Sequence, residues 1–106
     1  MITVTLTQEN NKAITGFAVS GHAKAGAHGM DIVCAGVSAL VQSAIMGIER
    51  HLGREIDLEQ NNDGLIMNLI GQPDSLTEAI LATMLLGLTE IAKLYPKSVR
   101  IIEHRR

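Results

Sequence analysis

The longest stretch without a charged residue most constrains how this chain folds. It runs from Ile32 to Ile48. Asp31, a preferred helix N-cap, precedes it, and Gly53, a preferred residue just past a helix end, follows it, so we expect a helix from Asp31 to about Leu52. Because its apolar residues are too many for one narrow stripe, this helix must be buried on more than one side. These apolar residues are Ile32, Val33, Val37, Leu40, Val41, Ile45 and Ile48.

The rest of the chain alternates strand patterns with a second helix pattern. Apolar residues and threonines alternate near the N-terminus, and Asn-Asn-Asp-Gly at 61–64 is a strong hairpin signal. The order β-β-α-β-β-α-β predicts an α+β domain over residues 1–106, with a five-stranded mixed sheet and two helices packed mainly on one face. The expected elements are strands at 2–7 and 13–20, a helix at 31–52, strands at 55–59 and 65–70, a helix at 75–94 and a strand at 98–104.

Composition excludes several classes of protein. The 106 residues carry 9 Lys+Arg against 11 Asp+Glu, and only 2% are aromatic, which argues against a basic nucleic-acid binder with base-stacking platforms. The hydrophobic content of 46% excludes a disordered chain. The single cysteine excludes an internal disulfide.

We expect a cytoplasmic protein that binds no membrane. The N-terminal sequence MITVTLTQEN lacks the basic and apolar regions of a secretory signal. The uncharged run is short for a membrane span and contains polar residues and glycines. Two apolar helices on a small sheet leave more apolar surface than one copy hides, so we also expect a homodimer.

The chemistry-bearing residues gather in one stretch, Gly21 to Leu40. If Asp31 is the N-cap, Cys34 is the third helical residue, where the helix dipole favours a thiolate over a thiol. His22 lies at the end of the second strand and is positioned to act as a general base. Backbone N–H groups around Cys34 and Ala35 are expected to hold an oxyanion.

Other interpretations of this stretch remain open. Asp31 either orients the imidazole, as the third member of a triad does, or only caps the helix. The residues His22, His28, Asp31 and Cys34 are all metal-ligand types, but their spacing fits no standard zinc pattern, and we predict no metal and no cofactor. A lone cysteine near a helix start is also commonly a small buried apolar residue. The rival function is a non-catalytic protein-binding module that grips its partner with the same stretch, the glycine-rich loop at residues 21–29.

The same stretch resembles the ribosomal-processing cysteine proteases, the Prp family. The similarity rests on Gly21-His22-Ala23, Gly26, Gly29 and the run Asp31-Ile32-Val33-Cys34-Ala35, followed by Ser38 and Ala39. It extends over the whole chain through the order of elements and the segment Thr83-Met84-Leu85. One departure is Gly36, where the family pattern leads us to expect alanine.

The resemblance implies a cysteine endopeptidase with a dyad of His22 and Cys34. It also implies that the substrate is the N-terminal extension of ribosomal protein number twenty-seven of the large subunit, and that two copies form a homodimer. We expect the peptide to be bound by Gly21, Gly26, Gly29, Ala35 and Ser38. The glycine-rich loop is expected to order over the bound peptide. The alternative to this enzyme is a non-catalytic ribosome-assembly or protein-binding module that uses the same loop.

Overall fold

The computed structural model of the chain describes residues 1–21 and 28–105, with the side chains of 28–31 and 105 outside the description. The predicted order of strands and helices is confirmed. A five-residue π-helical turn, η1, extends the first helix. The elements are β1 (Ile2–Gln8), β2 (Ile14–Ser20), α1 (His28–Met46), η1 (Gly47–His51), β3 (Ile56–Asn61), β4 (Gly64–Leu69), α2 (Ser75–Leu94) and β5 (Val99–Arg105).

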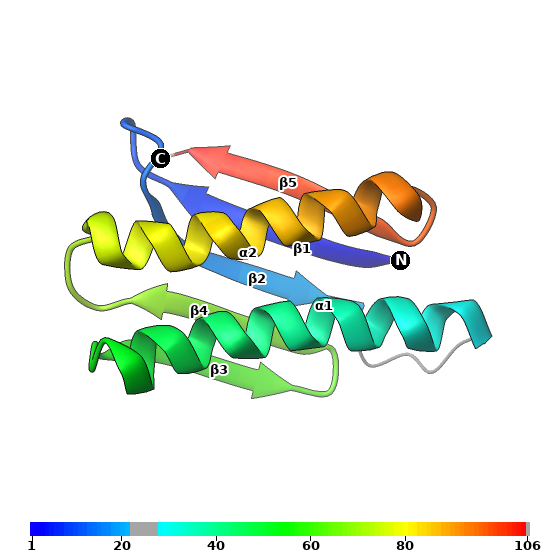
Figure 1. Ribbon diagram of the computed structural model, residues 1–106, viewed down its shortest axis with the longest axis horizontal. Coiled ribbons are helices and arrows are strands. Elements are labelled where there is room, and N and C mark those ends of the chain that lie inside the picture. The colour runs from blue at the N-terminus through cyan, green and yellow to red at the C-terminus, as the bar shows by residue number, and fades with distance from the viewer. Residues whose placement is uncertain (22–27, 106) are drawn as a thin grey trace.

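The five strands form one mixed sheet in the order β3-β4-β2-β1-β5. β1 pairs in parallel with β5 and antiparallel with β2, while β4 lies antiparallel between β2 and β3. Both helices lie on the same face of this sheet (Figure 1). The expected α+β fold, with two helices packed on one face, is therefore confirmed.

The core lies between the sheet and the helix layer. In β1, Ile2, Val4 and Leu6 are fully buried and alternate with half-buried threonines on the face away from the helices. This period of two is the pattern that predicted the strand. The buried residues facing these strands from the helices include Val33, Val37, Val41, Ile45, Leu81, Met84 and Leu88.

The two helices pack closely because glycines stand at their contacts. A Cβ on Gly36 would lie 3.3 Å from Cδ1 of Ile91, and one on Gly87 would lie 2.8 Å from Cδ1 of Leu40. Gly36, the departure from the family pattern, therefore faces α2 rather than the flank of α1 that carries Cys34.

The start of α1 differs from the prediction. The described helix begins at His28, so Asp31 is its fourth residue and is not the N-cap. The end of the helix was predicted correctly: after η1, Leu52 donates its N–H to the Gly47 carbonyl at 3.0 Å, and Gly53 has a φ of +66°. Such a left-handed residue ends a helix without strain only when it is glycine.

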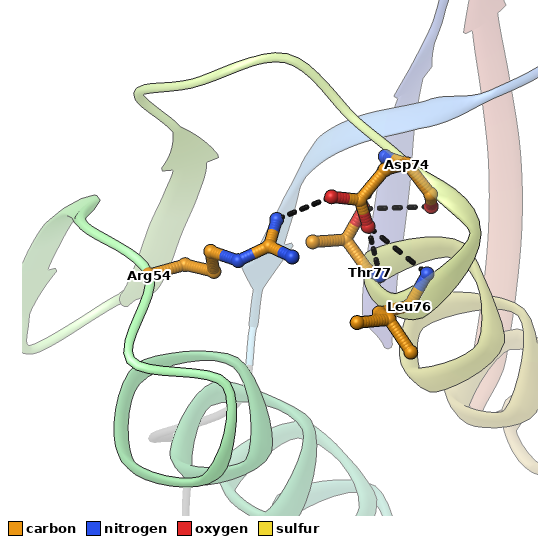
Figure 2. A network of polar contacts seen from close by, with 4 residues as sticks. All are labelled: Arg54, Asp74, Leu76 and Thr77. Carbon is orange, nitrogen blue, oxygen red and sulfur yellow. Dashed lines mark hydrogen bonds and ion pairs between the residues drawn. The ribbon is translucent and has the colours of Figure 1, made fainter.

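The start of α2 is capped by its own side chains, as Figure 2 shows. Asp74 accepts hydrogen bonds from the backbone N–H groups of Leu76 (2.9 Å) and Thr77 (3.1 Å), and Thr77 Oγ1 accepts from the Asp74 N–H at 2.9 Å. Arg54, just after η1, forms an ion pair with Asp74. These contacts hold the pKa of Asp74 below its ordinary value, the Thr77 N–H having the largest effect and the Arg54 hydrogen bond the next. The network joins the end of the first helical segment to the beginning of the second.

Candidate active site

Cys34 is the seventh residue of α1 and is half-buried beside the core. At 100° per residue, it shares a flank of the helix with Ser38, one turn further on. Gly36 lies on the opposite flank, against α2. The thiol is therefore carried on the side of α1 away from α2. Cys34 belongs to the first half of α1, and the start of α1 lies at the end of the helix layer opposite to the start of α2 (Figure 1).

The placement of Cys34 in the first helical turn was wrong. Because α1 begins at His28, the backbone N–H groups of Cys34 and Ala35 lie in the second turn, where they donate to the carbonyls four residues earlier. They are not available to an oxyanion in this conformation. The N–H groups without helical partners are those of the first turn, and the Cα–Cβ bond of Cys34 is tilted toward that end of the helix.

The other predicted site residues fall partly outside the described region. His22 and Gly26 lie outside the described residues. Gly29 and Asp31 are in the first turn of α1, and Asp31 is three residues before Cys34, which places the two on neighbouring positions of one helix face. Their side-chain contacts are not part of the described structure, so the orienting role of Asp31 stays a prediction.

The predicted peptide-binding residues on α1 differ in exposure. Ala35 is exposed on the outer side of α1, whereas Ser38 is half-buried. No group of three metal-binding side chains gathers among the residues whose positions are described. Of the four residues considered for a metal site, His22 lies outside the described residues, as do the side chains of His28 and Asp31.

Gly21, which directly precedes His22, is held by two distant parts of the chain. Its N–H donates to the Asp63 carbonyl at 3.0 Å, at the tip of the β3–β4 hairpin. Its φ is +77°, and a Cβ there would collide with the carbonyl oxygen of Met1. Glycine is therefore required at this position, and the hairpin tip positions the backbone that leads into His22. The sequence analysis did not predict this contact, because a backbone hydrogen bond between residues 42 positions apart leaves no local signal in the sequence.

The hairpin tip is itself fixed by an asparagine. Asn61 Oδ1 accepts hydrogen bonds from the N–H groups of Asp63 (2.8 Å) and Gly64 (3.1 Å). A cavity of about 170 Å³ beside it is lined by Ser20, Glu59 and Asp63 among others. The end of β2 thus combines an ordered backbone with an acidic surface.

The comparison with known families decides what this site is. The profile of the family described as "Cysteine protease Prp" matches residues 1–100. The chain belongs to the Prp family. Prp members are cysteine-type peptidases, so this protein is a hydrolase of that type, and the expectation of an enzyme is confirmed.

Named relatives of Prp support the assignment. The ribosomal processing cysteine protease Prp of Staphylococcus aureus is 32% identical over 103 residues, which are 95% of this chain and 97% of that protein. The Prp of Bacillus subtilis is 39% identical over 64 residues, which are 60% of this chain and 57% of that protein.

Solved structures show the same fold. SMU.848 from Streptococcus mutans superposes with a TM-score of 0.90 at 25% identity, covering 100% of this chain and 96% of that one. Prp from S. aureus, described as essential and solved with a covalently linked product peptide, gives a TM-score of 0.88 at 28% identity, covering 98% and 100%. The same S. aureus protease was also solved with a substrate peptide.

Proposed function

We propose that this chain is an endopeptidase that removes the N-terminal extension of ribosomal protein number twenty-seven of the large subunit, using Cys34 as nucleophile and His22 as general base. One observation carries the assignment of Cys34. The chain belongs to a cysteine protease family, and Cys34 is the single cysteine in its sequence. The relative that holds a covalently linked product peptide supports the same type of chemistry, since nucleophilic catalysis passes through a covalent peptide–enzyme species.

Geometry supports His22 among the four histidines. His51 lies 17 positions after Cys34 along α1 and η1, which at 1.5 Å per residue is about 25 Å. His104 is exposed on β5, an edge strand of the sheet. His28 is six residues before Cys34, a spacing that places it on a different face of the helix. His22 follows Gly21, whose N–H donates to the Asp63 carbonyl at 3.0 Å, and it is the histidine of the motif that carries the family resemblance.

The proposed reaction is a two-step acyl transfer. His22 takes the proton of the Cys34 thiol, and Sγ attacks the scissile carbonyl carbon to form a C–S bond. The first-turn N–H groups of α1 are the proposed donors to the oxyanion, because they are unpaired within the helix and lie toward the side chain of Cys34. Collapse of this intermediate breaks the C–N bond, and His22 protonates the leaving amine. Water then hydrolyses the thioester.

The proposal extends to the setting in which this activity takes place. We propose that residues 1–106 form one protease domain, that it acts in the cytoplasm and that it works as a homodimer. A substrate that belongs to the ribosome is encountered in that compartment, and the names of the relatives as ribosomal processing proteases support it.

The test is cleavage of a synthetic peptide that spans the extension and the mature N-terminus, together with iodoacetamide labelling of the thiol. We expect Cys34→Ala to abolish cleavage, by more than about 1000-fold, without altering the circular dichroism spectrum. His22→Ala should lose both cleavage and rapid labelling at neutral pH. His51→Ala is the matched control and should retain both.

Two results would contradict the proposal. Cleavage by Cys34→Ala removes the nucleophile assignment. A wild-type enzyme that cleaves an unrelated peptide but leaves the ribosomal peptide intact keeps the dyad and removes the proposed substrate.

A further inference from the structure

The face of the sheet opposite the helices is left uncovered by the described elements, since α1 and α2 both lie on the other face (Figure 1). The register of the strands identifies the side chains on it. Glu59 pairs with Ile66, and Ile66 pairs with Ala18. Ile66 is 46% exposed, whereas its neighbours Leu65 and Met67 are buried in the core. Because side chains alternate between the two faces of a strand, Ile66 and its cross-strand partners point away from the helices.

This helix-free face has a hollow where the ends of β2 and β3 and the start of β4 meet. It is the cavity of about 170 Å³ described above, and its lining includes Glu59, Asp63, Ile66 and Ala18. The volume is several times that of one water molecule and is enough for one long side chain. Apolar atoms beside carboxylates suit Lys or Arg, whose aliphatic stem packs on apolar surface while its charged end stays in a polar environment.

The hairpin that supplies most of this lining carries charge of one sign only. Residues 55–70 contain Glu55, Asp57, Glu59 and Asp63 and no Lys, Arg or His. The rest of the chain has more Lys and Arg than Asp and Glu, so the excess negative charge of the protein lies on this one hairpin. Such a segregated charge attracts a ligand of the opposite sign.

The acidic side chains around the hollow face solvent. Asp57, Glu59 and Asp63 are exposed. Within residues 1–21 and 28–105, no ion pair involves any of the three. Their charges therefore repel one another across short distances, and a cationic group that binds between them reduces this repulsion.

The hollow lies beside the candidate active site. The Asp63 carbonyl accepts the N–H of Gly21, the residue before His22. α1 lies over the β4–β3 side of the sheet and α2 over the β2–β1 side (Figure 1). Cys34 is carried on the flank of α1 away from α2, which is therefore the side of the β3 edge. A peptide held at Cys34 thus has the acidic hairpin on one side of it.

The proposed substrate carries the complementary charge. A ribosomal protein contacts RNA, and proteins that bind RNA neutralise its phosphates with Lys and Arg. The segment after the cut belongs to the mature ribosomal protein and is therefore expected to be basic, whereas the removed extension forms no part of the ribosome. Charge complementarity favours the mature segment over the extension as the occupant of the acidic hairpin.

We propose that the helix-free side of the β3–β4 hairpin binds a Lys or Arg side chain of the substrate segment that follows the cut. Glu59 and Asp63 receive its charged end, and Ile66 packs against its aliphatic stem. This inference rests on the proposed function and deepens it, because it assigns a subsite for substrate specificity outside the catalytic dyad.

A purely structural role for the carboxylates makes a different prediction. Charged residues on an edge strand prevent its pairing with another chain, and Asp57 and Glu59 on β3 serve that purpose as well. That role requires neither Asp63 at the hairpin tip nor a hollow on the face, and it gives no preference among substrates. The other edge strand, β5, carries charges of both signs, so charge of one sign is not a general property of the edges of this sheet.

The inference is tested by cleavage kinetics with two peptides that span the cut. One has the natural sequence, and in the other every Lys and Arg after the cut is replaced by Gln. We expect the wild-type enzyme to have a KM about fivefold lower for the natural peptide, the effect of a cation beside two exposed carboxylates, with kcat unchanged. This difference should shrink in about 0.5 M NaCl, because salt screens exposed charges.

The double variant Glu59→Gln, Asp63→Asn removes both charges and keeps the backbone carbonyl that holds Gly21. Its KM for the natural peptide should rise about fivefold, to the value for the Gln peptide. Its KM for the Gln peptide should stay that of the wild type. Glu103→Gln, at an exposed residue of β5, is the matched control and should retain the preference for the natural peptide.

Three results would overturn the inference while leaving the proposed function in place, because the ribosomal peptide is still cleaved in each. Equal wild-type KM values for the two peptides mean that the positive charge of the substrate is not recognised. A double variant that loses affinity for both peptides alike indicates a structural role. An equal loss in Glu103→Gln indicates an effect of the net charge of the whole protein. If neither peptide is cleaved, the proposed substrate is wrong and the inference falls with it.

Discussion

The two helices begin in different ways. The start of α2 carries a side-chain cap, whereas the start of α1 leads into the candidate nucleophile Cys34. α2 begins with Asp74, whose carboxylate accepts from Leu76 and Thr77 and pairs with Arg54. α1 begins at His28, three residues before the aspartate that resembled its cap. The start of α2 is thus fixed by its own side chains. Asp31 lies inside α1 and is not its N-cap, and its orienting role beside Cys34 stays a prediction.

The largest effect is expected at Gly21, which anchors the candidate-site end of the molecule. Gly21→Ala forces a side chain into a left-handed conformation and against the Met1 carbonyl, which should destabilise the fold by at least about 1–3 kcal/mol. Urea denaturation measures this. Gly71→Ala is the control, since nothing lies within 4 Å of a Cβ there, and its stability should be unchanged or slightly increased. Equal losses in the two variants would contradict a special role for Gly21.

The next largest effect is expected on activity, where substitutions of Asp31 and Asp74 should differ. Asp31→Asn should lower kcat/KM about tenfold through loss of an orienting carboxylate, with little change in Tm, because Asp31 is not the cap. Asp74→Asn should leave kcat/KM at 25 °C unchanged. A loss in Asp31→Asn as deep as that of His22→Ala would make Asp31 a full member of a triad.

The two aspartates should also differ in their effect on thermal stability, and here Asp74 should have the larger effect. Asp74→Ala removes the cap and the Arg54 ion pair of α2 and should lower Tm by about 5 °C. Differential scanning calorimetry measures it, with Asp31→Ala as the comparison. If Asp31→Ala lowers Tm as much, the assignment of the two helix starts is wrong.

The contribution of Asp74 should also depend on pH. Its folded pKa is depressed by the Thr77 N–H and Arg54, so its stabilising effect is present above the unfolded value of about 3.9 and disappears as pH falls through the folded value. The Tm difference between wild type and Asp74→Asn should therefore be full at neutral pH and shrink below about pH 4. A difference that stays constant to acid pH would contradict the ionic contribution.

The smallest effects concern the glycines between the helices, and they should have opposite signs. Gly36→Ala gains helix propensity and meets only the end of the Ile91 side chain at 3.3 Å, so it should stabilise by about 0.5 kcal/mol. Gly87→Ala meets Leu40 at 2.8 Å and should destabilise by about 1 kcal/mol. Thermal melts of both, compared with wild type, give the sign directly.

The elements that could be predicted are those whose signals are local. Alternation in β1, the Asn-Asn-Asp-Gly turn and Gly53 each identified an element or its end within a residue or two. The start of α1 could not be predicted in this way, because Asp31 satisfies the composition rule for a cap from inside the helix. The hydrogen bond between the Gly21 N–H and the Asp63 carbonyl depends on the packing of distant segments, which no local pattern encodes.

The family was predicted from the stretch after Gly21 and is confirmed. The roles of Cys34 and His22 stay predictions. The oxyanion donors assigned to Cys34 and Ala35 were wrong because they depended on the register of the helix start. A difference of three residues moved both amides from unpaired positions to hydrogen-bonded ones.

The parallel pairing of β1 with β5 places Ile2 beside Val99. The fifth strand can therefore join the sheet only after the chain has been made as far as residue 99 and beyond. Pairing across such a sequence separation slows folding, because the entropy of closing the chain is lost before the contact forms. A chain interrupted before residue 99 leaves β1, with its buried Ile2, Val4 and Leu6, as an open edge of the sheet. Such an edge is a template for aggregation. β5 therefore protects the chain as well as completing the sheet, because it covers the edge that β1 would otherwise expose.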